Sequence, residues 1–225
     1  NPTDITLPPL GAGQSLAPVL MAAPGGDGAF RPIAFPITLN PGETVIIDWG
    51  RKRTGWVTVA GRGSVDFAYG SDLKFFEIFD GEWGRKPDFH GDSVPTFFAT
   101  KARGRLDLGD QPQRIHERSA ALRFLRFKNC GTGPAAITLV SLKPSEFPAA
   151  PAGSFECSDE TLALGWRMGI DTVHLCTQPG EESNVPVFGP FGDGFVQWDG
   201  CRRDREIWGG DLRTGSLAWY YNWQD

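Results

Sequence analysis

The sequence has no long hydrophobic run and no excess of positive charge. No apolar stretch approaches the roughly 18 residues of a membrane-spanning helix, so we expect no membrane insertion. Lysine supplies only six of the 22 basic residues and the net charge is −5, so we also expect no nucleic-acid partner. The first residues contain no basic region followed by an apolar one. Either the protein is cytosolic, or a signal peptide has been removed.

Cysteine and histidine are scarce, and their spacing suits no metal site. No two cysteines form a Cys-x-x-Cys pair, and the three histidines lack the spacing of metal ligands. We therefore predict no metal ion and no cofactor. One or two disulfides would fit an oxidising compartment, and four buried thiols fit the sequence equally well. The cysteines in question are Cys130, Cys157, Cys176 and Cys201.

Glycine and proline are abundant, at 29 and 18 residues, and their spread suits short strands joined by turns. Residues 1–42 are predicted to form an extended segment that packs on the domain after it. From Glu43 onward, β-branched and aromatic residues alternate with polar ones, and no helical period occurs. We therefore predict an antiparallel, jelly-roll-like β-sandwich over residues 43–150, with a compact turn at 61–63. Its strands are expected at 43–49, 55–60, 64–69, 94–101, 103–108, 122–128 and 135–143.

The pattern becomes helical after a proline- and alanine-rich linker at residues 147–153. Ser158 is predicted to cap a helix whose first turn carries two acidic residues. Apolar residues then recur at three- and four-residue steps through about Gln178, at Leu162, Trp166, Ile170 and Val173. A second helix is expected near Leu212. Residues 151–225 are therefore predicted to begin a helical domain.

The strongest chemical signal lies in residues 199–211, which we name the acidic segment. Carboxylates and arginines crowd here between Trp198 and Trp208. In a sugar site, an aromatic face stacks on the C–H face of the ring, and carboxylates and guanidinium groups bind the hydroxyls. A carboxylic acid can also protonate a departing glycosidic oxygen. On charge alone, however, a self-paired surface segment is the commoner structure.

The acidic segment resembles the signature of α-L-rhamnosidases of the six-hairpin glycosidase class. The matching positions are Asp199, Arg203, Asp204, Trp208 and Gly210-Asp211. Other stretches agree, so that the likeness spans roughly residues 43–225. Residues 47–50 with Thr54-Gly55 look like part of the family's N-terminal sandwich, and residues 153–159 look like the opening of its catalytic domain.

The resemblance implies a role for each matching residue. Asp204 stands at the position of the general acid, where glutamate is commoner. Asp199, Arg203 and Asp211 match positions that bind rhamnose hydroxyls or orient the acid, and Trp208 matches an aromatic wall. The family inverts configuration with a second carboxylate as base, about 6.5–9.5 Å from the acid. We predict that burial or a neighbouring carboxylate raises the pKa of Asp204, since the acid must stay protonated.

The resemblance also implies what the chain lacks. The family's catalytic domain is an (α/α) six-hairpin barrel, and its general base lies far beyond residue 225. We therefore expect the chain to be a fragment or one piece of a cleaved, secreted enzyme. Its partners would be a rhamnoside or oligosaccharide substrate and the remainder of the barrel.

Three alternatives stay open at this point. The protein could be a glycosidase of the same class that acts on another sugar. It could also be a non-catalytic carbohydrate-binding module. An exposed strip of aromatic residues on one sheet face would favour that interpretation. A purely structural role is a third interpretation for residues 43–145, within a larger enzyme.

Overall fold

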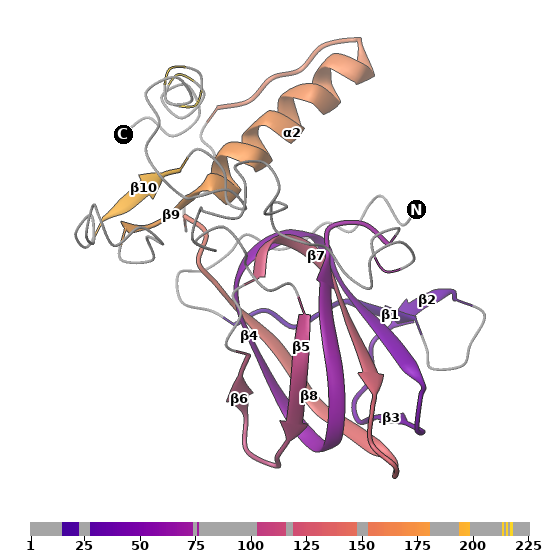
Figure 1. Ribbon diagram of the computed structural model, residues 1–225. Coiled ribbons are helices and arrows are strands. Elements are labelled where there is room, and N and C mark those ends of the chain that lie inside the picture. Colours follow the sequence, from indigo (N-terminus) through magenta and orange to yellow (C-terminus); the bar gives the residue numbers. More distant parts are fainter. Residues whose placement is uncertain are drawn as a thin grey trace, which may run out of the picture.

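The computed structural model describes residues 15–22, 28–73, 76, 103–115, 119–147, 153–180, 194–198, 213, 215 and 217 (Figure 1). In chain order its elements are β1 (Leu20–Ala22), β2 (Phe30–Pro32), β3 (Ile37–Leu39), β4 (Thr44–Gly70), β5 (Arg103–Leu108), β6 (Gln113–Arg114), β7 (Ser119–Asn129), β8 (Ala135–Pro144), α2 (Glu160–Cys176), β9 (Thr177–Pro179) and β10 (Phe195–Gln197). None of the helices described has the length and hydrophobicity to cross a lipid bilayer.

Strand β4 reverses direction twice and so contributes to both layers of the sandwich. Its first part (44–48) and its last part (65–70) pair with opposite edges of β7. Its middle part (55–62) pairs with β8, and residues 58–59 within it pair with β6. One layer therefore has the order β2-β1-β4-β7-β4-β5 and the other the order β3-β8-β4-β6. All of these pairings are antiparallel. The predicted turn at 61–63 is one of the two reversals, and Gly63 adopts a φ of 93° there.

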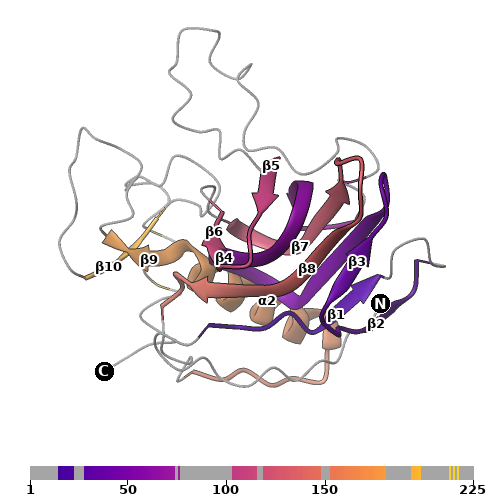
Figure 2. The same ribbon diagram turned by 90° about the horizontal axis from the view of Figure 1, so that it is seen from below.

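The fold class is confirmed: an antiparallel β-sandwich is followed by a helix. Figure 2 shows the curvature of the strands, with α2 behind them in this view. The strands predicted from residue 43 onward form, except for 94–101, which lies outside the described residues. The predicted domain boundaries stay a prediction. Strands β1 to β3, which fall within the predicted extended segment, belong to the same sheet as β4.

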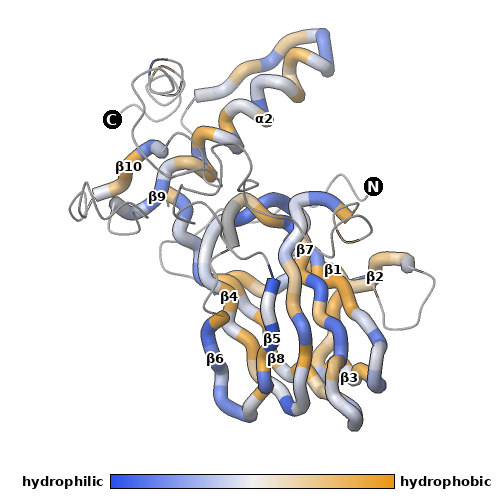
Figure 3. The backbone as a smooth tube through the Cα atoms, in the orientation of Figure 1, coloured by the Kyte–Doolittle hydropathy of each residue, from blue (hydrophilic) through white to orange (hydrophobic). Residues whose placement is uncertain are grey.

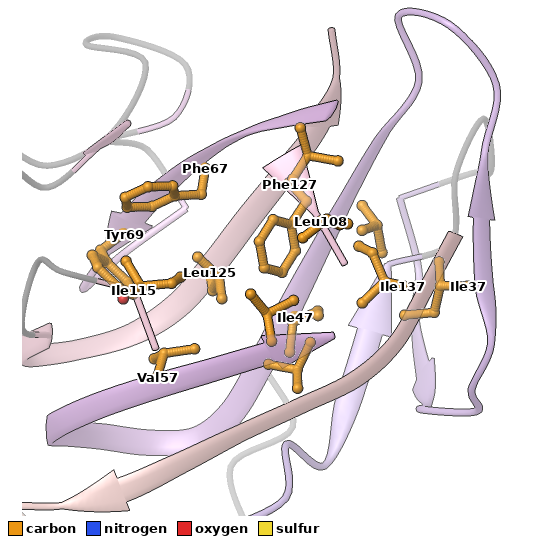
Figure 4. Packing of buried hydrophobic residues seen from close by; sticks show 14 of the residues in the cluster. Ile37, Ile47, Val57, Phe67, Tyr69, Leu108, Ile115, Leu125, Phe127 and Ile137 are labelled. Carbon is orange, nitrogen blue, oxygen red and sulfur yellow. The ribbon is translucent and has the colours of Figure 1, made fainter. Parts of the chain in front are cut away.

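Alternation of apolar and polar residues builds the core between the two layers (Figure 3). In stretches such as 44–47 and 56–59 of β4 and 135–138 of β8, buried residues alternate with less buried ones, in keeping with the two-residue repeat of a strand. Burying such a side chain contributes about 1.5–3 kcal/mol relative to leaving it in water. Figure 4 shows members of this cluster from both layers meeting side by side, among them Ile47, Val57, Phe67, Leu125, Phe127 and Ile137.

Helix α2 begins one residue later than the sequence predicts. The N-cap is Asp159, not Ser158, because the Asp159 carboxylate accepts hydrogen bonds from the backbone N–H groups of Thr161 (2.9 Å) and Leu162 (3.2 Å). The helix ends at Cys176, shortly before the predicted end at Gln178, because residues 177–179 pair with β10 as strand β9.

Candidate functional site

The first reversal of β4, at residues 48–55, lies at the end of the sandwich that faces α2 (Figure 1). The buried carboxylate of Asp48 accepts bonds from the Gly50 N–H (2.7 Å) and from two nitrogens of Arg123 (2.7 and 2.8 Å). A Cβ on Gly55 would lie 2.2 Å from the Lys143 carbonyl oxygen, so only glycine fits without a shift. The two motifs that resemble the family's sandwich therefore hold this reversal together.

A buried ion pair joins the reversal to the end of the sandwich. One nitrogen of the Arg53 guanidinium lies 3.2 Å from Glu146, and the two side chains are 3% and 0% exposed. The other Glu146 oxygen accepts the Thr54 N–H at 2.7 Å. Burial lowers the pKa of Arg53, and the neighbouring Glu146 opposes that shift. A buried charge of this kind is stable only while its partner is present.

Residue Phe147, directly after the ion pair, makes the contact with the helical part. Its N–H donates to the Thr177 carbonyl (3.2 Å), and its carbonyl lies at the ring Nε2 of His174. Because a carbonyl can only accept, His174 must donate this bond from Nε2. The Phe147 ring also meets the Phe195 ring edge-to-face, with centroids 5.1 Å apart. An exposed ion pair of Arg51 with Asp171, at 3.6 Å, adds a weaker link.

Strands β9 and β10 bring the chain to the start of the acidic segment. They pair antiparallel, with Gln197 opposite Thr177. The next residue, Trp198, is 2% exposed, and its backbone N–H donates to the Cys176 carbonyl at 2.9 Å. The chain is therefore fixed by a buried aromatic residue and the carboxyl end of α2 immediately before Asp199.

A described residue that follows the acidic segment lies beside Gln197. Residues 213, 215 and 217 are helical, in line with the predicted second helix. The Gln197 side chain lies directly against Gly215, so that a Cβ there would come within 2.0 Å of the Gln197 amide nitrogen. Gln197 and Gly215, which flank the acidic segment in the sequence, therefore lie against one another. The predicted site residues themselves, Asp199, Arg203, Asp204, Trp208 and Asp211, lie outside the described residues.

Three of the four cysteines are described, and none of these three is in a disulfide. Cys157 is exposed, which contradicts the interpretation of four buried thiols. Burial, helped by a hydrogen bond with Asp66, raises the pKa of the Cys130 thiol, so it is not an activated nucleophile. In the part of the chain that is described, no three potential ligands gather into a metal site.

Large apolar side chains are exposed on the helical part and not on the faces of the sandwich, as far as the structure describes them. They are Phe155, Leu162, Leu164, Met168, Phe195 and Leu217. The strip of exposed aromatic residues expected for a carbohydrate-binding sheet face is therefore missing from the described strands.

Solved structures share this arrangement. A rhamnosidase from Klebsiella oxytoca, solved with rhamnose bound, matches 94% of the chain with a TM-score of 0.63 at 18% identity. The chain has the fold of part of a rhamnosidase. A GH78 family rhamnosidase of Bacillus sp. GL1 matches 87% of the chain with a TM-score of 0.53 at 22% identity. The chain spans only 41% and 18% of these two proteins. No protein-family model and no curated protein sequence matches it.

Sequence reasoning missed the residues that connect the sandwich to the acidic segment. Arg53 and Glu146 are 93 positions apart, and no short motif pairs them. His174 lacks any metal-like spacing and so carries no signal of its own, yet it supports Phe147. Only the fold brings these residues together.

Proposed function

We propose that this chain is part of a glycoside hydrolase that cleaves terminal α-L-rhamnosides from plant glycosides or polysaccharides. The observation that carries the proposal is the fold shared with two rhamnosidases over both the sandwich and the helical part. The residues of the acidic segment resemble the family's signature. The segment follows directly after Trp198, which is buried within the shared fold.

In the proposed reaction, Asp204 protonates the leaving glycosidic oxygen. Asp199, Arg203 and Asp211 bind sugar hydroxyls, and Trp208 stacks on the sugar ring. A second carboxylate, supplied by the remainder of the barrel, activates a water on the opposite face of the sugar, which inverts the anomeric configuration. Secretion into the medium is part of the same proposal, and fractionation of cells and medium with an antibody would test it.

The surface of α2 supports a place within a larger helical domain. At 3.6 residues per turn, Leu162, Trp166, Ile170 and Val173 fall within about 80° of one another. Leu164, Met168 and Leu175 lie on the other side of the helix. The apolar residues in the last turns of α2, Ile170, Val173 and Leu175, are buried. Earlier in the helix, Leu162 and Met168 are each 60% exposed. A helix that is apolar on two faces packs between neighbours on both. We assign these neighbours to the remainder of an (α/α) six-hairpin barrel.

The test is an assay of the full-length protein on p-nitrophenyl α-L-rhamnoside, with Asp204→Asn beside it. Loss of a general acid lowers kcat by about 10²–10⁴-fold. The matched control is Asp110→Asn, because Asp110 forms an exposed ion pair with Arg62 on the sandwich. Unchanged turnover in Asp204→Asn would remove that residue from its role. A panel of other aryl glycosides separates rhamnose specificity from that of a related glycosidase, and the anomer first formed shows whether the reaction inverts.

A further inference from the structure

We infer that His174 and Phe147 are positioning residues, through which the sandwich holds the acidic segment in place. This inference rests on the proposed function, since it gives the sandwich a part in the same site. It differs from a sugar-binding role for the sandwich because it requires no ligand on the sheet faces.

The sandwich end of the connection is rigid because Glu146 uses both carboxylate oxygens. One faces Arg53 and the other accepts the Thr54 N–H, while the Ser145 N–H donates to the Thr54 carbonyl at 2.9 Å. Moving residue 146 would separate a fully buried carboxylate from a buried guanidinium. The backbone that enters Phe147 is thus fixed to β4.

The helical end of the connection is held by three contacts that all converge on Phe147. His174 donates to its carbonyl, Thr177 accepts its N–H, and Phe195 packs against its ring. His174 belongs to the last turn of α2, Thr177 to β9 and Phe195 to β10. One residue therefore contacts three elements, the last of which, β10, ends one residue before Trp198.

The contacts of Phe147 lead to Trp198, which is six positions before the proposed acid in the sequence. Phe195 is three residues before Trp198, and Trp198 is hydrogen-bonded to Cys176 at the end of α2. A displacement of about 1 Å at a reacting group can lower a rate about 10²-fold. Because the acidic segment carries both the proposed acid and the proposed sugar-binding residues, loosening the His174 bond is expected to lower kcat/KM.

The experiment uses the full-length protein with His174→Ala and His174→Gln, assayed on p-nitrophenyl α-L-rhamnoside. We expect His174→Ala to lower kcat/KM by roughly 10- to 100-fold. We expect His174→Gln to recover most of the loss, because its amide N–H₂ can still donate to the Phe147 carbonyl. Equal kcat/KM in His174→Ala and the parent, or equal losses in the two variants, would overturn the inference.

A second readout is independent of catalysis. The acidic segment contains Arg202, Arg203 and Arg205, so trypsin cleavage there, identified by fragment masses, reports how firmly it is held. We expect cleavage to be about tenfold faster in His174→Ala than in the parent or in Asp110→Asn. If the parent cleaves no rhamnoside while this difference appears, the proposed function fails and the positioning role stands. If the cleavage rates are equal, the positioning role fails, whatever the activity.

Discussion

Replacing Glu146 with glutamine would remove one charge from the buried ion pair without changing its shape. The amide oxygen introduced by Glu146→Gln can still accept the Thr54 N–H, so that bond is kept. The Arg53 guanidinium, 3% exposed, would lose its counter-charge. Breaking a buried pair by removing one partner costs about 3–5 kcal/mol, and the retained bond places Glu146→Gln near about 3 kcal/mol.

The size of this effect is measurable by thermal unfolding. At roughly 2–4 °C per kcal/mol for a domain of 150–250 residues, we expect the Tm to fall by about 6–12 °C. Near-ultraviolet circular dichroism of the full-length protein follows the transition. Asp110→Asn, in the exposed pair with Arg62, should leave the Tm unchanged.

A double variant separates the lost charge from lost packing. Arg53→Met combined with Glu146→Gln removes the stranded guanidinium and keeps the Thr54 bond. If the buried charge is the cause, the double variant should be more stable than Glu146→Gln alone, because apolar replacement of a buried pair is often neutral or favourable. A double variant no more stable than Glu146→Gln, or a fall in Tm of less than about 2 °C for Glu146→Gln, would refute this reasoning.

Two further predictions concern the backbone. Gly55→Ala should destabilise the protein by about 1–3 kcal/mol, because the new Cβ would meet the Lys143 carbonyl, whereas Gly109→Ala, with open space around it, should not; urea unfolding compares the two. Asp159→Ala should cost about 1 kcal/mol of helix stability and Ser158→Ala much less, measured in the same way; the reverse order would contradict the assignment of the cap.

The layers of the fold could be predicted from sequence because strand alternation is a local property. Stretches such as 64–69 and 122–128 carry their inward and outward faces within a few residues. The sequence predicts the cap of α2 one position too early, because Ser158 and Asp159 both have side chains that cap helices well. The hydrogen bonds that the Asp159 carboxylate accepts from Thr161 and Leu162, together with the extended backbone of Asp159, decide between them.

The connection at the candidate site could not be predicted, since it depends on contacts between distant residues. Nothing near Glu146 in the sequence indicates Arg53 as its partner, and nothing near His174 indicates the Phe147 carbonyl. The acidic segment is the opposite case. Residue types within a dozen positions predict its chemistry, and both this chemistry and the geometry of the segment stay predictions.

The double reversal of β4 has a consequence for how the chain folds. Strand β7 lies between two parts of β4, so it must pair on both edges with strands from an earlier stretch of the chain. Such non-local pairing is slow to form. Until β7 pairs with them, both parts of β4 expose unpaired N–H and C=O groups at their edges. Unpaired strand edges of this kind promote aggregation. Expression at low temperature or with chaperones should therefore raise the soluble yield, and substitutions that weaken β7 should lower it first.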